Sequence, residues 1–307
     1  MSRLFDALQR AGTEQSGVEY PDLMSVVTEV FEAQPGKAMP GRHGVDQVSP
    51  VPVTVLKPEA TEEPGQQPIS EGLLEFPSVS ISVAPSSRLV FFTEPDSLAS
   101  EKFRFLGVRL RHLQQSRSLK KVLVTSTIPE EGKSLVSANL AGVLACRKQR
   151  VLLIEGDLRR PVLAQQFGLG QLAGLGEWLQ GDRQSITNIY RLDDLNFWIM
   201  PAGDPPANPL ELMQPGRLSR LMEQVAKSFD WIFVDSPPLL PLADTTVWAR
   251  VTDGTLLVAR VGKTEKIQLQ RGLDIVKKSD LLGVVLNNCE HPDRNNYYQR
   301  YSPSATK

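Results

Sequence analysis

Residues 122–135 read VLVTSTIPEEGKSL, and their types and spacing could bind a phosphate group. Gly132, Lys133 and Ser134 stand where a turn gives way to a predicted helix. Free N–H groups at a helix N-terminus face an anion, and the helix dipole favours negative charge there. Lys133 would place a charge on the β- and γ-phosphates of ATP, and the Ser134 hydroxyl is a suitable ligand for Mg²⁺. We therefore predict an ATP- and Mg²⁺-binding loop formed by Pro129, Glu130, Glu131, Gly132, Lys133, Ser134 and Leu135.

This loop departs from the usual phosphate-binding pattern in two ways. Thr127 occupies the position of the first Gly, and Glu130 and Glu131 bring acidic side chains close to a polyphosphate. The alternative is a Gly-Lys-Ser turn that starts an ordinary helix. The apolar run 122–124 before the loop and the apolar helix predicted at 135–146 favour the phosphate-binding interpretation.

Three polar residues follow other apolar runs and would complete this site. Asp157, Asp235 and Asn287 come just after predicted strands. In a parallel sheet the carboxyl ends of the strands share one edge, where ligands bind. Asp235 would hold Mg²⁺ as a Walker B acid, and the Asn287 amide could read a nucleotide base. Taken singly, Asp157 could cap a helix, Asp235 could form a turn and Asn287 could end a strand.

A second acidic site follows the loop helix, because Glu155 and Asp157 lie in the sequence Glu-Gly-Asp. A carboxylate beside Mg²⁺·ATP could act as a base towards an incoming hydroxyl. Tyr297, Tyr298 and Tyr301 supply hydroxyls in a polar C-terminal tail. Together these features suggest that the tail itself is phosphorylated. The alternative is a chance cluster of tyrosines in a disordered tail.

The elements that must position these residues alternate along the chain from residue 96. Apolar runs predict strands at 122–124, 151–154, 197–200, 231–234, 255–261 and 281–286. Periodic patterns predict helices at 97–114, 135–146, 172–179 and 267–278, and one or two helices at 210–229. Repeated βα units with near-continuous apolar strands predict an α/β fold, in which a mostly parallel sheet carries helices on both faces.

We divide the chain into three parts. Residues 1–95 comprise a short amphipathic helix and a linker that is rich in Pro, Gly, Ser and Glu and largely disordered. Apolar patches at 73–76 and 79–83 could add an edge strand or bind a partner. Residues 96–290 form the α/β domain, and residues 291–307 form a flexible tail with the tyrosines.

Charge and cysteine content narrow the functional classes. The 34 Lys and Arg residues balance 35 Asp and Glu residues, so we expect no nucleic-acid partner. Two cysteines are too few for a disulfide scaffold and fit a reducing compartment, and Cys146 is expected in the core. The chain has no apolar run of about 18 residues and no secretion signal, so we expect a cytoplasmic location.

These motifs together resemble the bacterial tyrosine kinases (BY-kinases) of capsular and exopolysaccharide synthesis, in particular the soluble type that partners a membrane chain-length determinant. The resemblance covers residues 97–301. TSTIPEEGKSL is similar to the family's Walker A motif, LLIEGDLRRP to its Walker A′ motif, and FDWIFVDSPPLLPLADT to its Walker B motif. The resemblance implies a P-loop NTPase fold of the deviant Walker type, like that of the MinD and ParA ATPases.

The resemblance also implies a role for each site residue. Lys133 would bind the ATP phosphates, Ser134 and Asp235 would hold Mg²⁺, and Asp157 would support the metal or the attacking phenol. Glu155 would be the first acid of the Walker A′ motif and is counted among the catalytic residues.

The family's regulation would follow from the same resemblance. The three tail tyrosines would be autophosphorylated on a neighbouring subunit of a ring, through an interface that includes Glu101 and Arg104. A membrane chain-length determinant would activate the kinase and hold it at the inner membrane. The kinase would then regulate the polymerisation and export of the polysaccharide.

Two residues depart from the family pattern. The family has Asp at the position of Glu155, and a shift near 1 Å in a catalytic group can cost about 10²-fold in rate. Glu155 could therefore reduce activity, and a large gain in rate for Glu155→Asp would show that it does. The family's ring motif is Glu-x-x-Arg-x-x-Arg. In this chain Gly107 replaces the second Arg, which puts ring formation in doubt.

Two other functions remain open at this point. A partition- or division-site ATPase of the MinD and ParA type would carry Lys five residues before Lys133, where this chain has Ile128. A catalytically weakened kinase could instead serve as a nucleotide-binding scaffold of the polysaccharide export complex.

Overall fold

The computed structural model describes residues 76–181, 186–193, 195–240, 242–276 and 280–289, and the backbone of strand β1 (Thr28–Val30). The other strands are β2 (Ser78–Val79), β3 (Lys121–Ser126), β4 (Val151–Glu155), β5 (Tyr190–Leu192), β6 (Phe197–Met200), β7 (Trp231–Asp235), β8 (Gly254–Arg260) and β9 (Leu281–Asn287).

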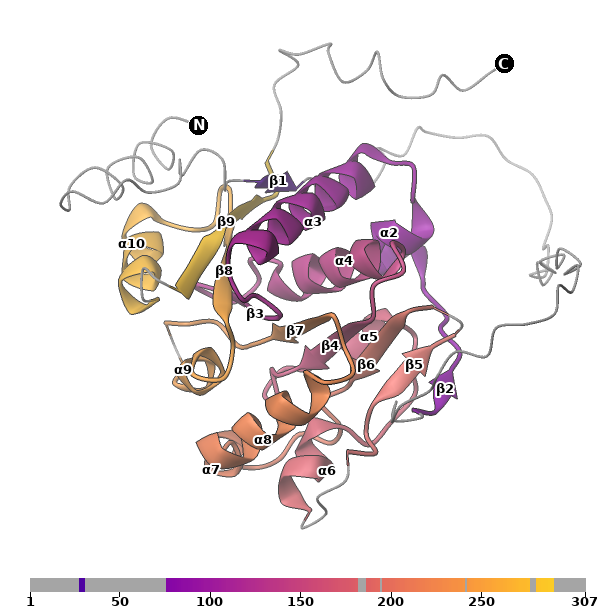
Figure 1. The fold of residues 1–307 in the computed structure, drawn as a ribbon. Helices are drawn as coiled ribbons and strands as arrows, with labels where there is room; N and C mark the ends of the chain where they lie inside the picture. The colour runs from indigo at the N-terminus through magenta and orange to yellow at the C-terminus, as the bar shows by residue number, and fades with distance from the viewer. Residues whose placement is uncertain are drawn as a thin grey trace, which may run out of the picture. The chain divides into compact units, whose positions relative to one another are not determined.

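The described strands form one sheet in the order β1-β9-β8-β3-β7-β4-β6-β5-β2 (Figure 1). Every neighbouring pair is parallel except β5 and β6, which are antiparallel. The order places β3, which leads into the phosphate loop, between β7 and β8. The predicted α/β fold with a mostly parallel sheet is confirmed.

The central strands are buried on both faces, because their apolar residues alternate between two cores. Val122 and Val124 of β3 belong to one core, and Leu123 belongs to the other. On β4, Leu153 and Ile154 divide in the same way. This packing explains why the strands read as continuous apolar runs.

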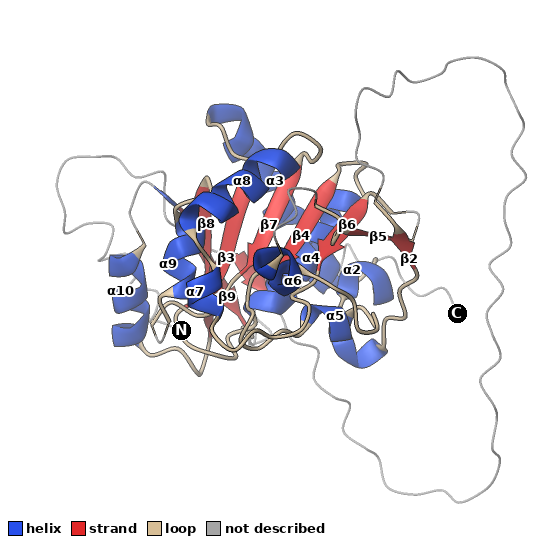
Figure 2. Ribbon diagram, turned by 90° about the horizontal axis from the view of Figure 1, so that it is seen from below, coloured by secondary structure: helices blue, strands red, loops and turns tan. Residues whose placement is uncertain are grey.

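Helices cover both faces of the sheet (Figure 2). The first core contains residues of α2 (Val90–Thr93), α3 (Leu98–Ser116), α4 (Lys133–Ala145) and α5 (Leu163–Gln166). The second contains residues of α6 (Leu175–Gln180), α7 (Pro209–Leu212), α8 (Pro215–Val225) and α9 (Asp244–Ala249). Helix α10 (Lys266–Ile275) packs with β8 and β9 in a third cluster.

The folded domain begins before residue 96, the boundary predicted from the sequence. Leu89 is fully buried, and the Phe91 N–H donates to Asn139 Oδ1 at 3.3 Å. The Phe91 ring lies so close to Gly142 of α4 that a Cβ there would come within 2.4 Å of it. Farther upstream, β2 pairs with β5 at the edge of the sheet, as the apolar patch at 79–83 allowed.

Most other predicted elements lie within a few residues of the observed ones. The region 210–229, predicted to form one or two helices, forms two, α7 and α8. The helices α2, α5 and α9 and the strands β1 and β5 were not predicted, because each is too short to show a clear period. The prediction that Cys146 lies in the core is wrong: α4 ends at Ala145, and Cys146 is exposed.

Candidate nucleotide site

The phosphate loop joins the buried strand β3 to the N-terminus of α4. Gly132, the N-cap residue of α4, has φ of +92°, a conformation that glycine adopts without strain. A Cβ at this position would lie 2.1 Å from Asn287 Nδ2, so no other residue fits between the loop and β9. Residues 133–145 continue as a helix that is buried along most of its length, which fixes the direction of its N-terminus.

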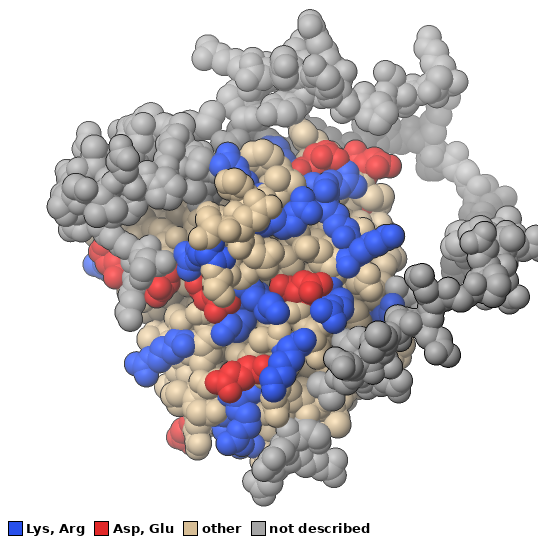
Figure 3. Space-filling model, in the orientation of Figure 1, with Lys and Arg blue, Asp and Glu red and all other residues tan. Residues whose placement is uncertain are grey.

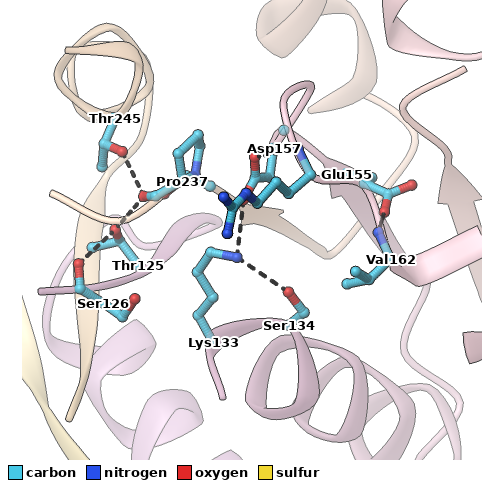
Figure 4. Close-up of polar contacts among 12 residues, drawn as sticks. Thr125, Ser126, Lys133, Ser134, Glu155, Asp157, Val162, Pro237 and Thr245 are labelled. Atoms are coloured by element: carbon cyan, nitrogen blue, oxygen red, sulfur yellow. Dashed lines mark hydrogen bonds and ion pairs between the residues drawn. The ribbon is translucent and has the colours of Figure 1, made fainter. Parts of the chain in front are cut away.

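Lys133 extends from the first turn of α4 towards the carboxyl edge of the sheet (Figure 4). Its Nζ lies 3.0 Å from Asp157 Oδ2 and 3.4 Å from Ser134 Oγ. Burial acts to lower the pKa of Lys133, but the nearby carboxylates of Asp235, Asp157 and Glu155 outweigh it and raise this pKa. The ammonium group therefore stays charged where the phosphate groups of a nucleotide would bind.

Asp235 ends β7 at the same level of the sheet as Val124 of β3 and Glu155 of β4. Its side chain is buried, and neither carboxylate oxygen has a hydrogen-bond partner among the described residues. Burial raises the pKa of Asp235 to about 6, against the lowering effect of Lys133. The buried Asp235 carboxylate and the neighbouring Ser134 hydroxyl supply oxygen ligands of the kind that Mg²⁺ takes.

Glu155 does not face Lys133, although sequence reasoning grouped it with the catalytic residues. Its Oε1 accepts the N–H groups of Val162 and Leu163 at 2.5 and 2.6 Å, and its Oε2 accepts the N–H of Ala202 at 3.0 Å. Burial raises the pKa of Glu155, and these N–H groups oppose the rise. The carboxylate thus ties the end of β4 to the start of α5 and to the segment after β6.

Asn287, predicted to read a base, also bonds to the backbone. Its Nδ2 donates to the Glu131 carbonyl and its Oδ1 accepts the N–H of Asn288, both at 2.9 Å. The side chain is fully buried and holds the phosphate loop against the end of β9. Recognition of a base by Asn287 stays a prediction.

The helix α9, which the sequence did not reveal, contacts two strand ends of the site. Its buried Asp244 accepts bonds from Arg159 Nε at 2.8 Å and Nη2 at 3.2 Å. The same helix packs Trp248 against Gly156, where a Cβ would lie 2.8 Å from the indole nitrogen. Contacts with α9 therefore hold the segment that contains Gly156 and Asp157 in place. No sequence pattern pairs Arg159 with Asp244, since 85 positions separate them.

A shared carbonyl links α9 to the strands that flank the loop. The Pro237 carbonyl accepts the hydroxyl of Thr125 at 2.8 Å and that of Thr245 at 2.6 Å (Figure 4). Thr125 belongs to β3, Pro237 follows the Walker B strand β7, and Thr245 belongs to α9. These bonds keep Asp235 in register with the phosphate loop.

The predicted subunit-interface residues lie on α3, and they contact one another. Arg104 pairs with Glu101 and also donates to the Pro95 carbonyl at 2.8 Å. Gly107 is buried, and a Cβ there would come within 3.2 Å of the Leu144 side chain of α4. The departure from the ring motif therefore occurs at a helix–helix contact inside this domain. Figure 3 shows acidic and basic side chains interspersed on the face that carries α3.

Tyr297, Tyr298 and Tyr301 lie outside the described residues. Among the described helices, none combines the length and the apolar character needed to cross a bilayer.

The sheet, the loop before α4 and the acids at the strand ends define the P-loop NTPase fold class. No family model matches the chain. The tyrosine-protein kinase YwqD of Bacillus subtilis (strain 168) is 34% identical over 201 residues, which cover 65% of this chain and 85% of YwqD. The kinase domain of Escherichia coli tyrosine kinase ETK superposes with a TM-score of 0.61 and 28% identity, over 68% of this chain and 84% of that domain. This chain belongs to the family of bacterial tyrosine-protein kinases.

The fold is also that of the division-site ATPases. The cell division ATPase MinD of Pyrococcus furiosus superposes with a TM-score of 0.50 and 26% identity, over 57% of this chain and 75% of that one. This likeness confirms the predicted deviant Walker fold, and the kinase domain covers more of this chain. Several longer tyrosine-protein kinases match too, but the chain spans only 27% to 34% of their length.

Proposed function

We propose that the chain is an ATP-dependent protein-tyrosine autokinase that phosphorylates its own C-terminal tyrosines. The observation that carries this proposal is the cluster of Lys133, Asp157 and Asp235 at one edge of the sheet, at the N-terminus of α4. Membership of the tyrosine-protein kinase family supports phosphoryl transfer as the use of this cluster.

Each member of the cluster has a distinct part in the proposed reaction. Lys133 and the free N–H groups of α4 would bind the β- and γ-phosphates of ATP. Ser134 and Asp235 would hold Mg²⁺, with Asp157 close by, and the metal would neutralise the charge of the phosphate oxygens. Asp157 would also accept the proton of the incoming phenol, and its contact with Lys133 orients it for this.

The acceptors in this proposal are Tyr297, Tyr298 and Tyr301. The resemblance noted from the sequence supports a role in exopolysaccharide or capsule polymerisation and export. It also supports a membrane chain-length determinant as the activator, which would hold a cytoplasmic kinase at the inner membrane. We propose self-association through the α3 surface around Glu101 and Arg104, so that one subunit phosphorylates another.

The alternatives are less well supported. A partition-type ATPase would need a lysine at position 128, where the chain has Ile, and the kinase relatives cover more of the chain than MinD does. A scaffold without transfer activity was suggested by Glu155 and Gly107, but Lys133 still lies 3.0 Å from Asp157, and the carboxylate of Asp235 acts on the same ammonium group, whatever the role of Glu155.

The deciding experiment is to incubate the purified chain with Mg²⁺·ATP, with and without the cytoplasmic segment of the candidate membrane activator, and to map phosphotyrosine by mass spectrometry. We expect phosphate on Tyr297, Tyr298 or Tyr301 that is absent from Lys133→Met. The matched control replaces Tyr190 by Phe, since this tyrosine lies in β5 and its hydroxyl donates to the Ala173 carbonyl. ATP hydrolysis without phosphotyrosine would indicate a switch ATPase, and nucleotide binding alone would indicate a scaffold.

A further inference from the structure

Glu131 is an acidic residue inside the phosphate loop, yet its side chain is fully buried. Its carboxylate accepts the Thr127 hydroxyl at 2.9 Å, the Ile128 N–H at 2.8 Å and the hydroxyl of Thr264. With three donors around it, the negative charge is held beneath the loop. This arrangement resolves the conflict that an acidic side chain would otherwise create beside a polyphosphate.

Thr264 comes from a different part of the chain, the turn between β8 and α10. Its Oγ accepts the Arg260 N–H at 2.7 Å, and its own N–H donates to the Arg260 carbonyl at 2.9 Å. Because this oxygen accepts a hydrogen bond from the backbone, its own hydrogen is free to be donated to Glu131. Thr264 is 8% exposed, so water does not replace this donor readily.

Two residues from the C-terminal part of the domain therefore hold the phosphate loop in place. Thr264 holds the side chain of Glu131, and Asn287 holds the carbonyl of the same residue. Thr127 explains why the usual first Gly is missing: its hydroxyl bonds to Glu131 and its methyl group packs against Gly272 of α10. Gly132 and Lys133 follow directly, so the position of Glu131 sets where the phosphate-binding N–H groups lie.

We propose that Thr264 is a positioning residue for nucleotide binding, which acts through Glu131 on the conformation of the phosphate loop. The inference rests on the proposed nucleotide site. Because Thr264 would act through Glu131 and not by contact with the nucleotide, we expect it to change affinity more than the transfer step. At nearly constant volume, Thr264→Val removes both the donor to Glu131 and the acceptor of the Arg260 N–H, and Thr264→Ser restores both.

The test measures the affinity of the full chain for Mg²⁺·ADP by calorimetry, and KM and kcat for ATP in autophosphorylation. We expect Thr264→Val to weaken binding and raise KM by about tenfold, the effect of one hydrogen bond to a charged group, while kcat changes by less than about threefold. Thr264→Ser should bind within about twofold of the wild type. Thr93→Val is the matched control, because its hydroxyl bonds to the Leu89 carbonyl in α2, on the other face of the sheet.

A second variant keeps the test decisive if Thr264→Val unfolds. Glu131→Gln keeps the shape but weakens the acceptor, and it should raise the dissociation constant in the same way. Wild-type affinity in folded Thr264→Val, or a loss of affinity that Thr264→Ser does not restore, would overturn the inference. If the wild-type chain itself binds no nucleotide, the proposed function fails instead, which separates the two outcomes.

Discussion

Lys133 Nζ lies 3.0 Å from Asp157 Oδ2, so the cation offered to a phosphate group is also paired with the acid that follows β4. Asp157 competes with phosphate for this cation, and its negative charge repels the phosphate group. We predict that Asp157→Asn binds ADP several-fold more tightly than the wild type when Mg²⁺ is chelated, since about 1 kcal/mol of such repulsion is removed. Titration calorimetry in EDTA measures this affinity.

The same variant should lose phosphoryl transfer by about 10²-fold or more, because it lacks the base and a support for the metal. Lys133→Met serves as the comparison and should weaken ADP binding about 10²-fold even in EDTA. If Asp157→Asn and Lys133→Met weaken binding equally, Asp157 is needed to hold Lys133 in place and does not compete with phosphate.

The buried carboxylate of Asp235 predicts a dependence of stability on pH. Burial raises its pKa from 3.8 to about 6, so the folded state binds this proton more tightly than the unfolded state does. The contribution of this group to the free energy of unfolding is complete below the unfolded pKa and is lost as the pH rises through 6. Asp235→Asn has no such loss, and at pH 7.5 it should be more stable than the wild type by roughly 1–3 kcal/mol.

Urea unfolding at pH 4.5 and pH 7.5, without divalent ions, tests this prediction. When the pH rises from 4.5 to 7.5, the free energy of unfolding should fall more for the wild type than for Asp235→Asn. An equal change in both proteins would contradict it. Since Mg²⁺ competes with the proton for Asp235, the affinity of the wild type for Mg²⁺ should rise between pH 5 and 7, which calorimetry can follow.

The pair formed by Arg159 and Asp244 should stabilise the domain more than a surface pair does. The Asp244 side chain is 2% exposed and that of Arg159 is 37% exposed, and the hydrogen bond of the pair raises the pKa of Arg159. We predict that Arg159→Gln destabilises the protein by about 1–3 kcal/mol, since it leaves a buried carboxylate unpaired.

Arg150 provides the matched control for this prediction. It pairs with Asp230 at 3.2 Å, and both side chains are about 40% exposed, so Arg150→Gln should cost less than about 1 kcal/mol. Thermal or urea unfolding compares the two variants. Equal losses would mean that burial of Asp244 adds nothing to the pair.

Glu155 leads to a prediction opposite to the one made from the family motif. The shorter Asp cannot reach the N–H groups of Val162, Leu163 and Ala202 together from the same backbone position. We predict that Glu155→Asp lowers the free energy of unfolding by about 1–3 kcal/mol through unsatisfied buried groups, and that it gives no gain in autophosphorylation rate. Phosphotyrosine formation and urea unfolding are measured on the same preparation, and a large gain in rate would restore Glu155 to the catalytic group.

The sequence was sufficient to predict the residues that stand at strand ends. Lys133, Asp157 and Asp235 each follow an apolar run, and a parallel sheet must bring such positions to one edge. It was not sufficient to predict how far a side chain reaches once it is there. Glu155 accepts hydrogen bonds from backbone N–H groups whose positions depend on how α5 and β6 pack. Cys146 is exposed because α4 ends at Ala145, one residue before the predicted end of this helix.

Contacts between distant positions were beyond prediction for a related reason. Nothing in the local pattern of Glu131 or Arg159 indicates a partner, because Thr264 and Asp244 lie on turns and short helices that have no period of their own. These contacts complete the site, although they contribute none of its reacting atoms.

The closure of the phosphate loop has a consequence for how the protein is made. Glu131 is synthesised 133 residues before Thr264 and 156 residues before Asn287, the two residues that hold it. The strand β3 likewise waits for both of its neighbours, β7 and β8. Since chains emerge from the ribosome N-terminus first, the nascent protein carries this loop without the contact from Asn287 while the next 156 residues, about half of the chain, are made. We therefore expect the loop to reach its phosphate-binding conformation only after β9 has left the ribosome.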